Sequence, residues 1–164
     1  MVQANQPYRG IMMTITTLAA GCFWGVEAKF RQLPGVLSTR VGYTGGHTDN
    51  PDYKTVCTGT TGHAEAIEIR FNPDIISFSN LLDFFWQIHD PMTLNRQGPD
   101  IGSQYRSAVF YHDDEQKLQA ELKKKQLNET QDFPKPIVTE ITAVSHFYPA
   151  EEYHQCYIEK QRGM

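Results

Sequence analysis

Apolar and polar residues follow one another along this chain in short blocks whose period changes repeatedly. The first block, residues 14–20, is rich in β-branched side chains and is typical of a strand. Apolar residues then recur at helical spacing, which predicts a helix that begins near Cys22 and stops at Pro34-Gly35. The change of period therefore places a tight strand-to-helix turn just before Cys22.

The remaining blocks continue this interleaving of strands and helices. Strands are predicted at 36–43, 63–71, 105–111 and 138–144, with helices at 79–89, from Asp113 onward, and at 150–161. Two long irregular segments, 42–62 and 90–104, carry glycine, proline and polar residues without periodicity. This order predicts an α+β fold, a mixed sheet with packed helices and a ferredoxin-like split βαβ core. We expect a flexible N-terminal leader over 1–13 and a single domain over 14–164.

The turn Gly21-Cys22-Phe23-Trp24-Gly25 holds the first candidate for chemistry. A thiol at the start of a helix faces unpaired backbone N–H groups and the positive end of the helix dipole. Both favour the thiolate, which is the reactive form of cysteine. The two adjacent aromatic residues would supply an apolar binding surface. The pattern therefore predicts a reactive Cys22.

Glu65 is the second candidate, because of its place in the strand 63–71. It shares one face with Ile67, Ile69 and Phe71, so we expect it to be desolvated, whereas Glu68 on the other face should be solvated. Desolvation raises the pKa of a carboxyl group and makes it suitable as a general acid near neutral pH. An acid at a strand end that simply reaches water is the alternative.

Composition narrows the possible functions. The chain has 164 residues, with 40% hydrophobic and 21% charged residues, as in ordinary globular proteins. A formal net charge of -4 argues against nucleic acid as a partner, and no apolar stretch is long enough to cross a membrane. Three widely spaced cysteines do not form a disulfide framework, and no Cys or His spacing predicts a metal site. These features predict a cytoplasmic protein.

Four other interpretations of Cys22 stay open at this point. It could be a buried, inert cysteine. Ala19-Ala20-Gly21-Cys22 could end a lipoprotein signal, although the threonines before it favour a strand. The chain could be a cysteine hydrolase of the Cys/His type, which would need a histidine beside Cys22. It could also be a binding module with an aromatic cage for a methylated cation, formed by Phe23, Trp24, Tyr43, Tyr53 and Tyr105.

A set of motifs in fixed order resembles one family over roughly residues 14–161. The motifs are Gly21-Cys22-Phe23-Trp24-Gly25, Gly42-Tyr43-Thr44-Gly45-Gly46, Tyr53-Lys54-Thr55-Val56-Cys57, Thr61-Gly62-His63-Ala64-Glu65, Asn95-Arg96-Gln97-Gly98 with Asp100, Gln104-Tyr105-Arg106-Ser107 and Ala150-Glu151-Glu152-Tyr153-His154-Gln155. In these residues the chain resembles peptide methionine sulfoxide reductases of the A class. The resemblance implies a single catalytic domain that reduces methionine S-sulfoxide, free or in oxidised proteins, to methionine.

The resemblance also implies roles for individual residues. Cys22 would attack the sulfoxide sulfur and become a sulfenic acid, while Glu65 would protonate the departing oxygen. Tyr53 and Tyr105 match positions that hydrogen-bond this oxygen, and Asp100 matches a further polar site residue. Phe23 and Trp24 match the wall that receives the methyl group of the substrate.

The recycling step is where this sequence departs from the family. Many members resolve the sulfenic acid with cysteines in a C-terminal tail, and this sequence has no cysteine after Cys156. Cys57 lies in a family motif but does not resolve there. Either Cys156 or an external thiol (thioredoxin, glutaredoxin or glutathione) should therefore restore Cys22. We favour the external thiol, because a cysteine on a helix is a rigid resolver. We expect a monomer with no metal and no cofactor other than the thiol reductant.

Overall fold

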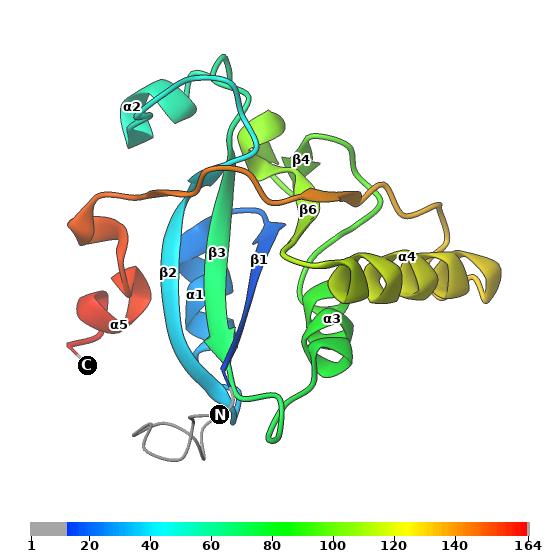
Figure 1. Ribbon diagram of the computed structural model, residues 1–164. Helices are drawn as coiled ribbons and strands as arrows, with labels where there is room; N and C mark the ends of the chain where they lie inside the picture. The colour runs from blue at the N-terminus through cyan, green and yellow to red at the C-terminus, as the bar shows by residue number, and fades with distance from the viewer. Residues whose placement is uncertain (1–12, 164) are drawn as a thin grey trace.

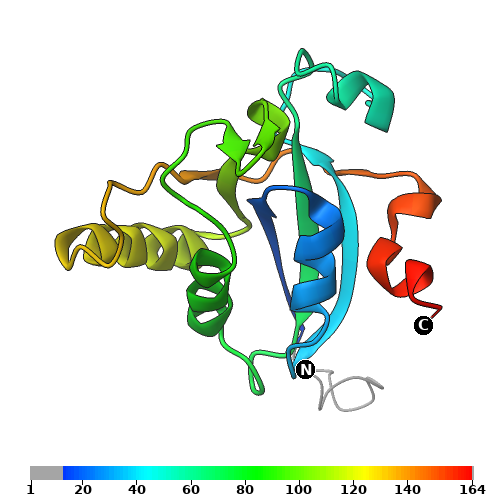
Figure 2. The ribbon, with the colours of Figure 1, turned by 180° about the vertical axis from the view of Figure 1, so that it is seen from behind.

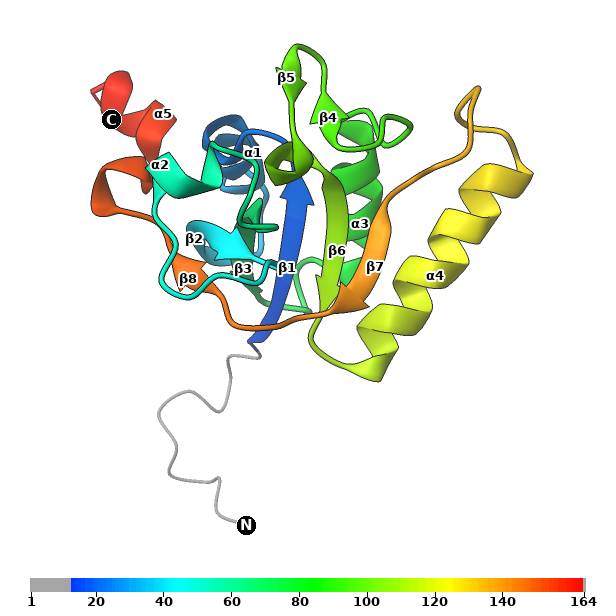
Figure 3. The same ribbon diagram turned by 90° about the horizontal axis from the view of Figure 1, so that it is seen from above.

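The computed structural model of this protein describes residues 13–163, and within them six strands form one sheet. The strand order is β7-β6-β1-β3-β2-β8 (Figure 3). The strands are β1 (Thr14–Ala20), β2 (Val36–Thr44), β3 (Ala64–Phe71), β6 (Ser107–Tyr111), β7 (Glu140–Ala143) and β8 (Tyr148–Pro149). The leader expected over 1–13 lies, apart from Met13, outside the described residues.

The centre of the sheet has the predicted split βαβ arrangement. Helix α1 (Phe23–Phe30) connects β1 to β2, and β3 pairs antiparallel between these two strands. Helix α3 (Phe78–Gln87) connects β3 to β6, and β1 pairs antiparallel between those two. These two interlocked units confirm the α+β, ferredoxin-like prediction.

Two additions extend this core at the sheet edges. Helix α4 (Asp114–Glu129) leads into β7, which pairs parallel with β6. The chain then crosses the sheet on the face opposite α1 and pairs β8 antiparallel with β2 (Figures 1 and 2). Gly42 permits this close crossing, because a Cβ there would lie 2.6 Å from the Phe147 ring. The last elements are the short helix η3 (Glu152–His154) and α5 (Tyr157–Gln161).

The main core lies between the sheet and the helices. Leu18, Ile67 and Ile69 from the sheet pack against Phe30 of α1 and Phe85 of α3, and all five are completely buried. A second cluster of small residues and Phe110 occupies the opposite face, where Val144 and Phe147 of the crossing segment pack against it. Strand β3 is therefore covered on both faces.

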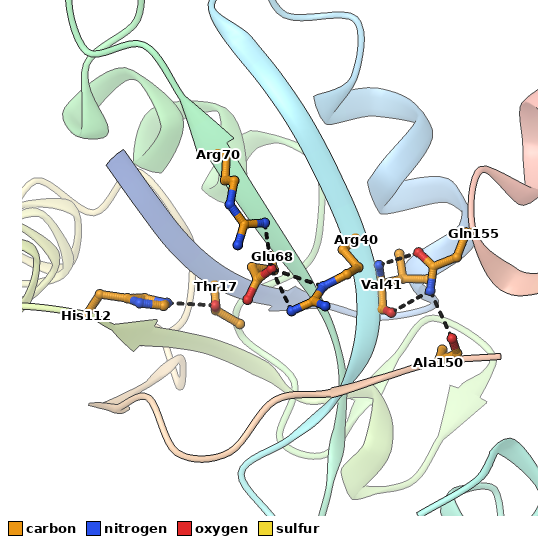
Figure 4. Close-up of polar contacts among 8 residues, drawn as sticks. All are labelled: Thr17, Arg40, Val41, Glu68, Arg70, His112, Ala150 and Gln155. Atoms are coloured by element: carbon orange, nitrogen blue, oxygen red, sulfur yellow. Dashed lines mark hydrogen bonds and ion pairs between the residues drawn. The ribbon is translucent and has the colours of Figure 1, made fainter. Parts of the chain in front are cut away.

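This double cover makes the predicted solvation of Glu68 wrong. Glu68 is 6% exposed, and its Oε1 accepts from Arg40 Nη2 and Arg70 Nη1 at 3.0 Å each (Figure 4). The Arg40 guanidinium also lies 5.2 Å from the centre of the Phe147 ring, in cation–π geometry. The two arginines enclose the carboxylate that the strand pattern alone placed in water.

Other predicted boundaries also need correction. The continuous helix expected over 150–161 is wrong, because only the short helices η3 and α5 lie in this region and Cys156 between them has a left-handed backbone (φ 52°). The strand expected from Tyr105 begins at Ser107, and Tyr105 ends the short helix η2 (Ser103–Tyr105). The irregular segments contain the short helix α2 (Tyr53–Val56) and the two-stranded pair β4 (Arg96–Gln97) and β5 (Asp100–Ile101).

Over the part of the chain that the structure describes, no helix combines the length and the apolar character needed to cross a lipid bilayer.

The burial of Glu68 generates a stability prediction. Glu68→Ala leaves two arginines without their shared acceptor, so we expect it to lower the free energy of unfolding by about 1–3 kcal/mol. Urea denaturation measures the change, with Glu121→Ala on the exposed side of α4 as the control. An unchanged free energy of unfolding would show that the partly exposed arginines find equal partners in water.

Candidate active site

The candidate site lies where three strand ends meet. Because β1 runs antiparallel to both β3 and β6, its C-terminal end lies beside the N-terminal ends of the other two. Cys22 follows β1, Glu65 is near the start of β3, and Tyr105 just precedes β6. The sheet therefore brings together three residues that are far apart in the sequence.

Cys22 sits at the N-cap of α1, at the predicted turn. Gly21 before it has φ +97°, and a Cβ there would lie 2.8 Å from Gln97 Cγ, so only glycine fits this turn. Burial raises the pKa of the Cys22 thiol, and the negative charges of Glu65 and Asp100 raise it further. The backbone N–H groups of Trp24 and Gly25 lower it, but by less. The expectation that the helix end makes Cys22 a ready thiolate is therefore wrong.

Glu65 is buried as expected, with 1% of its surface exposed. Its Oε1 accepts a hydrogen bond from the Phe23 backbone N–H at 3.2 Å. Burial raises the pKa of Glu65 to about 7, against a smaller lowering by that hydrogen bond and with a further rise from Asp100. A carboxyl group with this pKa carries its proton in much of the population at neutral pH, as a proton donor requires.

Two phenols and one carboxylate complete the polar part of the site. Burial, followed by the charge of Glu65, raises the pKa of Tyr105 to about 12. Burial and the neighbouring Cys57 also raise the pKa of Tyr53 well above its usual value, and Glu65 adds to this. Both hydroxyls therefore remain protonated donors. The charge of Asp100 acts on Cys22, Glu65 and Tyr105, which places its carboxylate in the same cluster.

The loop that carries Tyr53 is held by polar contacts at both ends. Helix α2 has a capping box, in which Asp52 Oδ1 accepts from the Thr55 N–H and Thr55 Oγ1 accepts from the Asp52 N–H. His63 is buried and accepts from the Gly46 N–H through Nδ1, which leaves Nε2–H to donate to Thr48 O. These contacts give a segment without apolar periodicity a fixed shape.

Phe23 and Trp24, the residues expected to form an apolar wall, follow Cys22 directly at the start of α1. Phe23 is buried against Tyr43, with ring centres 5.7 Å apart, and Trp24 stacks loosely on Tyr53 at 6.4 Å. Trp24 is partly exposed and therefore accessible to a ligand.

Sequence reasoning missed the residues that support this wall. Trp24 Nε1–H donates to His154 Nδ1 at 2.8 Å, and Tyr157 stacks on the Trp24 ring at 3.9 Å with an interplanar angle of 11°. His154 is fully buried. His154 appeared in a family motif, but no local pattern could connect it to a tryptophan 130 residues away.

The other two cysteines lie in different surroundings. Cys57 is exposed and lies beside the hydroxyls of Tyr53 and Tyr105. Burial raises the pKa of the Cys57 thiol, and hydrogen bonds from these two hydroxyls lower it. Burial and the charge of Glu27 raise the pKa of the Cys156 thiol, while Arg31 lowers it. The structure thus brings together Cys22, Glu65, Tyr53, Tyr105 and Asp100, and it places Cys156 outside this cluster.

The Cys/His hydrolase alternative finds little support in this geometry. The ionisable side chains that shift the pKa of Cys22 are Glu65 and Asp100, and no histidine is among them, whereas a Cys/His hydrolase needs one. Within residues 13–163, no group of three or more His, Cys, Asp or Glu side chains is arranged to hold a metal ion.

Comparisons with known proteins agree with this site. Residues 14–164 match the family model described as peptide methionine sulfoxide reductase. The peptide methionine sulfoxide reductase MsrA of Methanothermobacter thermautotrophicus is 60% identical over 144 residues, covering 88% of this chain and 85% of the relative. MsrA of Acidobacterium capsulatum is 55% identical over 152 residues, covering 93% and 97%.

Solved structures give the same result. Mxr1 from Saccharomyces cerevisiae in reduced form has a TM-score of 0.87 at 38% identity, covering 95% of this chain and 89% of that one. Methionine sulfoxide reductase A of Corynebacterium diphtheriae has a TM-score of 0.82 at 33% identity, covering 96% and 77%. Sequence and structure therefore place this chain in the peptide methionine sulfoxide reductase family.

Proposed function

We propose that this peptide-methionine (S)-S-oxide reductase uses Cys22 as its nucleophile and Glu65 as its proton donor. The observation that carries the proposal is the buried Glu65, with a pKa of about 7, held at the turn that presents Cys22. A thiol beside a protonated acid and two phenol donors suits a substrate with a basic oxygen on an electrophilic sulfur.

The geometry suggests how the substrate binds. The sulfoxide methyl group would pack against Phe23 and Trp24, and the oxygen would point toward the hydroxyls of Tyr53 and Tyr105. Asp100 would hold polar atoms around the reacting group. This arrangement directs the sulfoxide sulfur at Cys22 in one orientation, which accounts for selection of the S epimer.

The chemical step then transfers oxygen and two electrons. The Cys22 sulfur attacks the sulfoxide sulfur and forms an S–S bond, while the sulfoxide oxygen takes the proton of Glu65. The hydroxyl group so formed then moves from the methionine sulfur to the Cys22 sulfur. The S–S bond breaks and its electron pair leaves with the reduced methionine sulfur, so Cys22 becomes a sulfenic acid. The proton lost by the Cys22 thiol restores the Glu65 carboxyl group, so atoms and charges balance.

Recycling requires a thiol, and we propose an external one. The thiol attacks the Cys22 sulfenic acid, releases water and forms a mixed disulfide, which a second thiol reduces. A structure of yeast Mxr1 in complex with Trx2, with a TM-score of 0.64 at 25% identity, supports thioredoxin as this reductant. Glutaredoxin and glutathione supply the same chemistry. We further expect a cytoplasmic monomer that repairs oxidised proteins without a metal or another cofactor.

The first functional prediction concerns the nucleophile. Cys22→Ser should abolish reduction of methionine S-sulfoxide with dithiothreitol as reductant, because a hydroxyl cannot form the sulfenic acid. The parent enzyme should reduce the S epimer and leave the R epimer unchanged. Cys156→Ser serves as the control and should keep its turnover with dithiothreitol. Turnover by Cys22→Ser above background would refute the proposed mechanism.

The second prediction concerns proton donation. Glu65→Gln should slow the formation of methionine in a single turnover by about 10²- to 10⁴-fold, the usual cost of losing a positioned acid. Rapid-quench measurement isolates this step from recycling. Glu121→Gln, an exposed acid on α4, is the matched control. A reduction of less than threefold in Glu65→Gln would assign the proton to another group.

The third prediction follows from the linkage between the pKa of Glu65 and stability. The pKa of Glu65 rises from 4.5 in the unfolded chain to about 7 in the folded protein. Between these pH values the folded protein keeps a proton that the unfolded chain has lost. The parent therefore loses stability as the pH rises and Glu65 ionises. Glu65→Gln removes this loss. Its free energy of unfolding relative to the parent should therefore rise by about 2–3 kcal/mol between pH 5 and pH 8. Urea titrations at both pH values measure it, and a pH-independent difference would contradict the raised pKa.

A further inference from the structure

Glu27 is a buried carboxylate that the proposed reaction does not use. It lies on α1 and is 0% exposed. Its Oε1 accepts from the Cys156 backbone N–H at 2.8 Å, and its Oε2 accepts from Thr39 Oγ1–H at 2.7 Å. A carboxylate buried in this way is costly unless its hydrogen bonds are maintained, so these partners hold each other in place.

The Cys156 N–H belongs to a segment that we call the C-terminal clasp, residues 150–159. The Gln155 side-chain amide binds β2 as a strand would, accepting from the Val41 N–H and donating to Val41 O, both at 2.9 Å (Figure 4). Arg31, which follows α1, and Glu159 form an ion pair at 2.9 Å. Helix α5 has no buried residue, whereas Ala150 and His154 earlier in the clasp are buried. Polar anchors therefore act together with the packing of Ala150 and His154 to hold the clasp on α1 and β2.

The clasp also supports the substrate wall. His154 and Tyr157, which flank Cys156 closely in sequence, contact Trp24 by a hydrogen bond and by ring stacking. The charged groups around the Cys156 thiol are Glu27, Arg31, Glu159 and Lys160, whereas those around Cys22 are Glu65 and Asp100. A closed clasp thus fixes Trp24 and keeps Cys156 in surroundings different from those of Cys22.

We infer that Glu27 is a positioning residue that locks the clasp closed, and that the enzyme binds its substrate only in this state. The Cys156 N–H that Glu27 holds lies between His154 and Tyr157 in sequence, so opening the clasp at Glu27 also loosens their contacts with Trp24. The link to substrate binding rests on the proposed function, whereas the lock itself does not.

The lock is tested without activity, by the reactivity of Cys156. In a Cys22→Ser/Cys57→Ser background Cys156 is the only thiol. Because this thiol is already partly exposed in the closed clasp, opening is reported by the change in its rate of reaction with Ellman's reagent from the parent background to each variant. Glu27→Ala should raise this rate about tenfold or more, because a charge-assisted hydrogen bond is lost. Glu27→Gln keeps an oxygen acceptor and should react nearly as slowly as the parent background. Glu121→Ala is the control for removal of an exposed acid.

A second variant controls for the possibility that Glu27→Ala raises the labelling rate by unfolding α1. Gln155→Ala breaks the clasp from its own side and leaves the core intact, so it should also raise the labelling rate, with an unchanged circular dichroism spectrum. Unchanged labelling in both Glu27→Ala and Gln155→Ala would overturn the lock.

The link to the substrate wall is tested in the enzyme with its three cysteines. Glu27→Ala and Gln155→Ala should raise KM for methionine S-sulfoxide about tenfold with a smaller change in kcat, since Trp24 loses its support before any chemistry. Glu27→Gln should restore KM. Faster labelling with an unchanged KM would overturn this link. Loss of all turnover in the parent would instead refute the proposed function, because the labelling experiment needs none.

Discussion

Burial of Glu65 in the central strand, with the Phe23 N–H as its hydrogen-bond donor, is the constraint on which the site depends. The register that pairs Tyr43 with Glu65 also buries Ile67 and Ile69, so the carboxyl group cannot turn to solvent without disturbing the core. One N–H offsets only part of the desolvation penalty of the charged form. The fold therefore keeps an acid that is protonated in much of the population near the start of β3, at a cost in stability at neutral pH.

The same constraint acts on the nucleophile. At the start of α1, the N–H groups of Trp24 and Gly25 favour the Cys22 thiolate, but burial and two nearby acids outweigh them. When Glu65 carries its proton, one of the two opposing charges disappears. Ionisation of Glu65 at higher pH thus removes the proton donor and disfavours the thiolate together. The acid and the nucleophile are one coupled unit rather than two independent groups.

Local sequence patterns predicted the structural features that depend on neighbouring residues. They missed the features that depend on contacts with residues far away in the sequence. The change of period at Cys22 and the alternation around Glu65 are local, and the structure confirms the turn and the burial of the acid. Glu68 was misplaced because period-two alternation does not reveal that Phe147 covers the other face of the sheet. The predicted sign of the Cys22 pKa shift was wrong for a similar reason, since burial by distant parts of the chain raises this pKa most and the charges of Glu65 and Asp100 raise it further.

The irregular segments mark the limit of such patterns. Tyr53 and Asp100 lie in segments without periodicity, so family motifs singled them out, and capping and loop contacts then fix their geometry. The helix expected over 150–161 failed because Gln155 satisfies the backbone groups of Val41 and Ala150 instead of continuing a helix.

The apolar wall of the site combines the earliest and the latest parts of the described chain. Trp24 follows the turn that holds Cys22, whereas His154 and Tyr157 come from the clasp. The clasp is held by side-chain hydrogen bonds to Glu27 and Val41 and by the packing of these two rings on Trp24. On the proposed function, a methyl group that packs on Trp24 gains most when the clasp is closed, so substrate binding and clasp closure favour each other. Departure of methionine removes that preference at the moment when Cys22 needs a thiol.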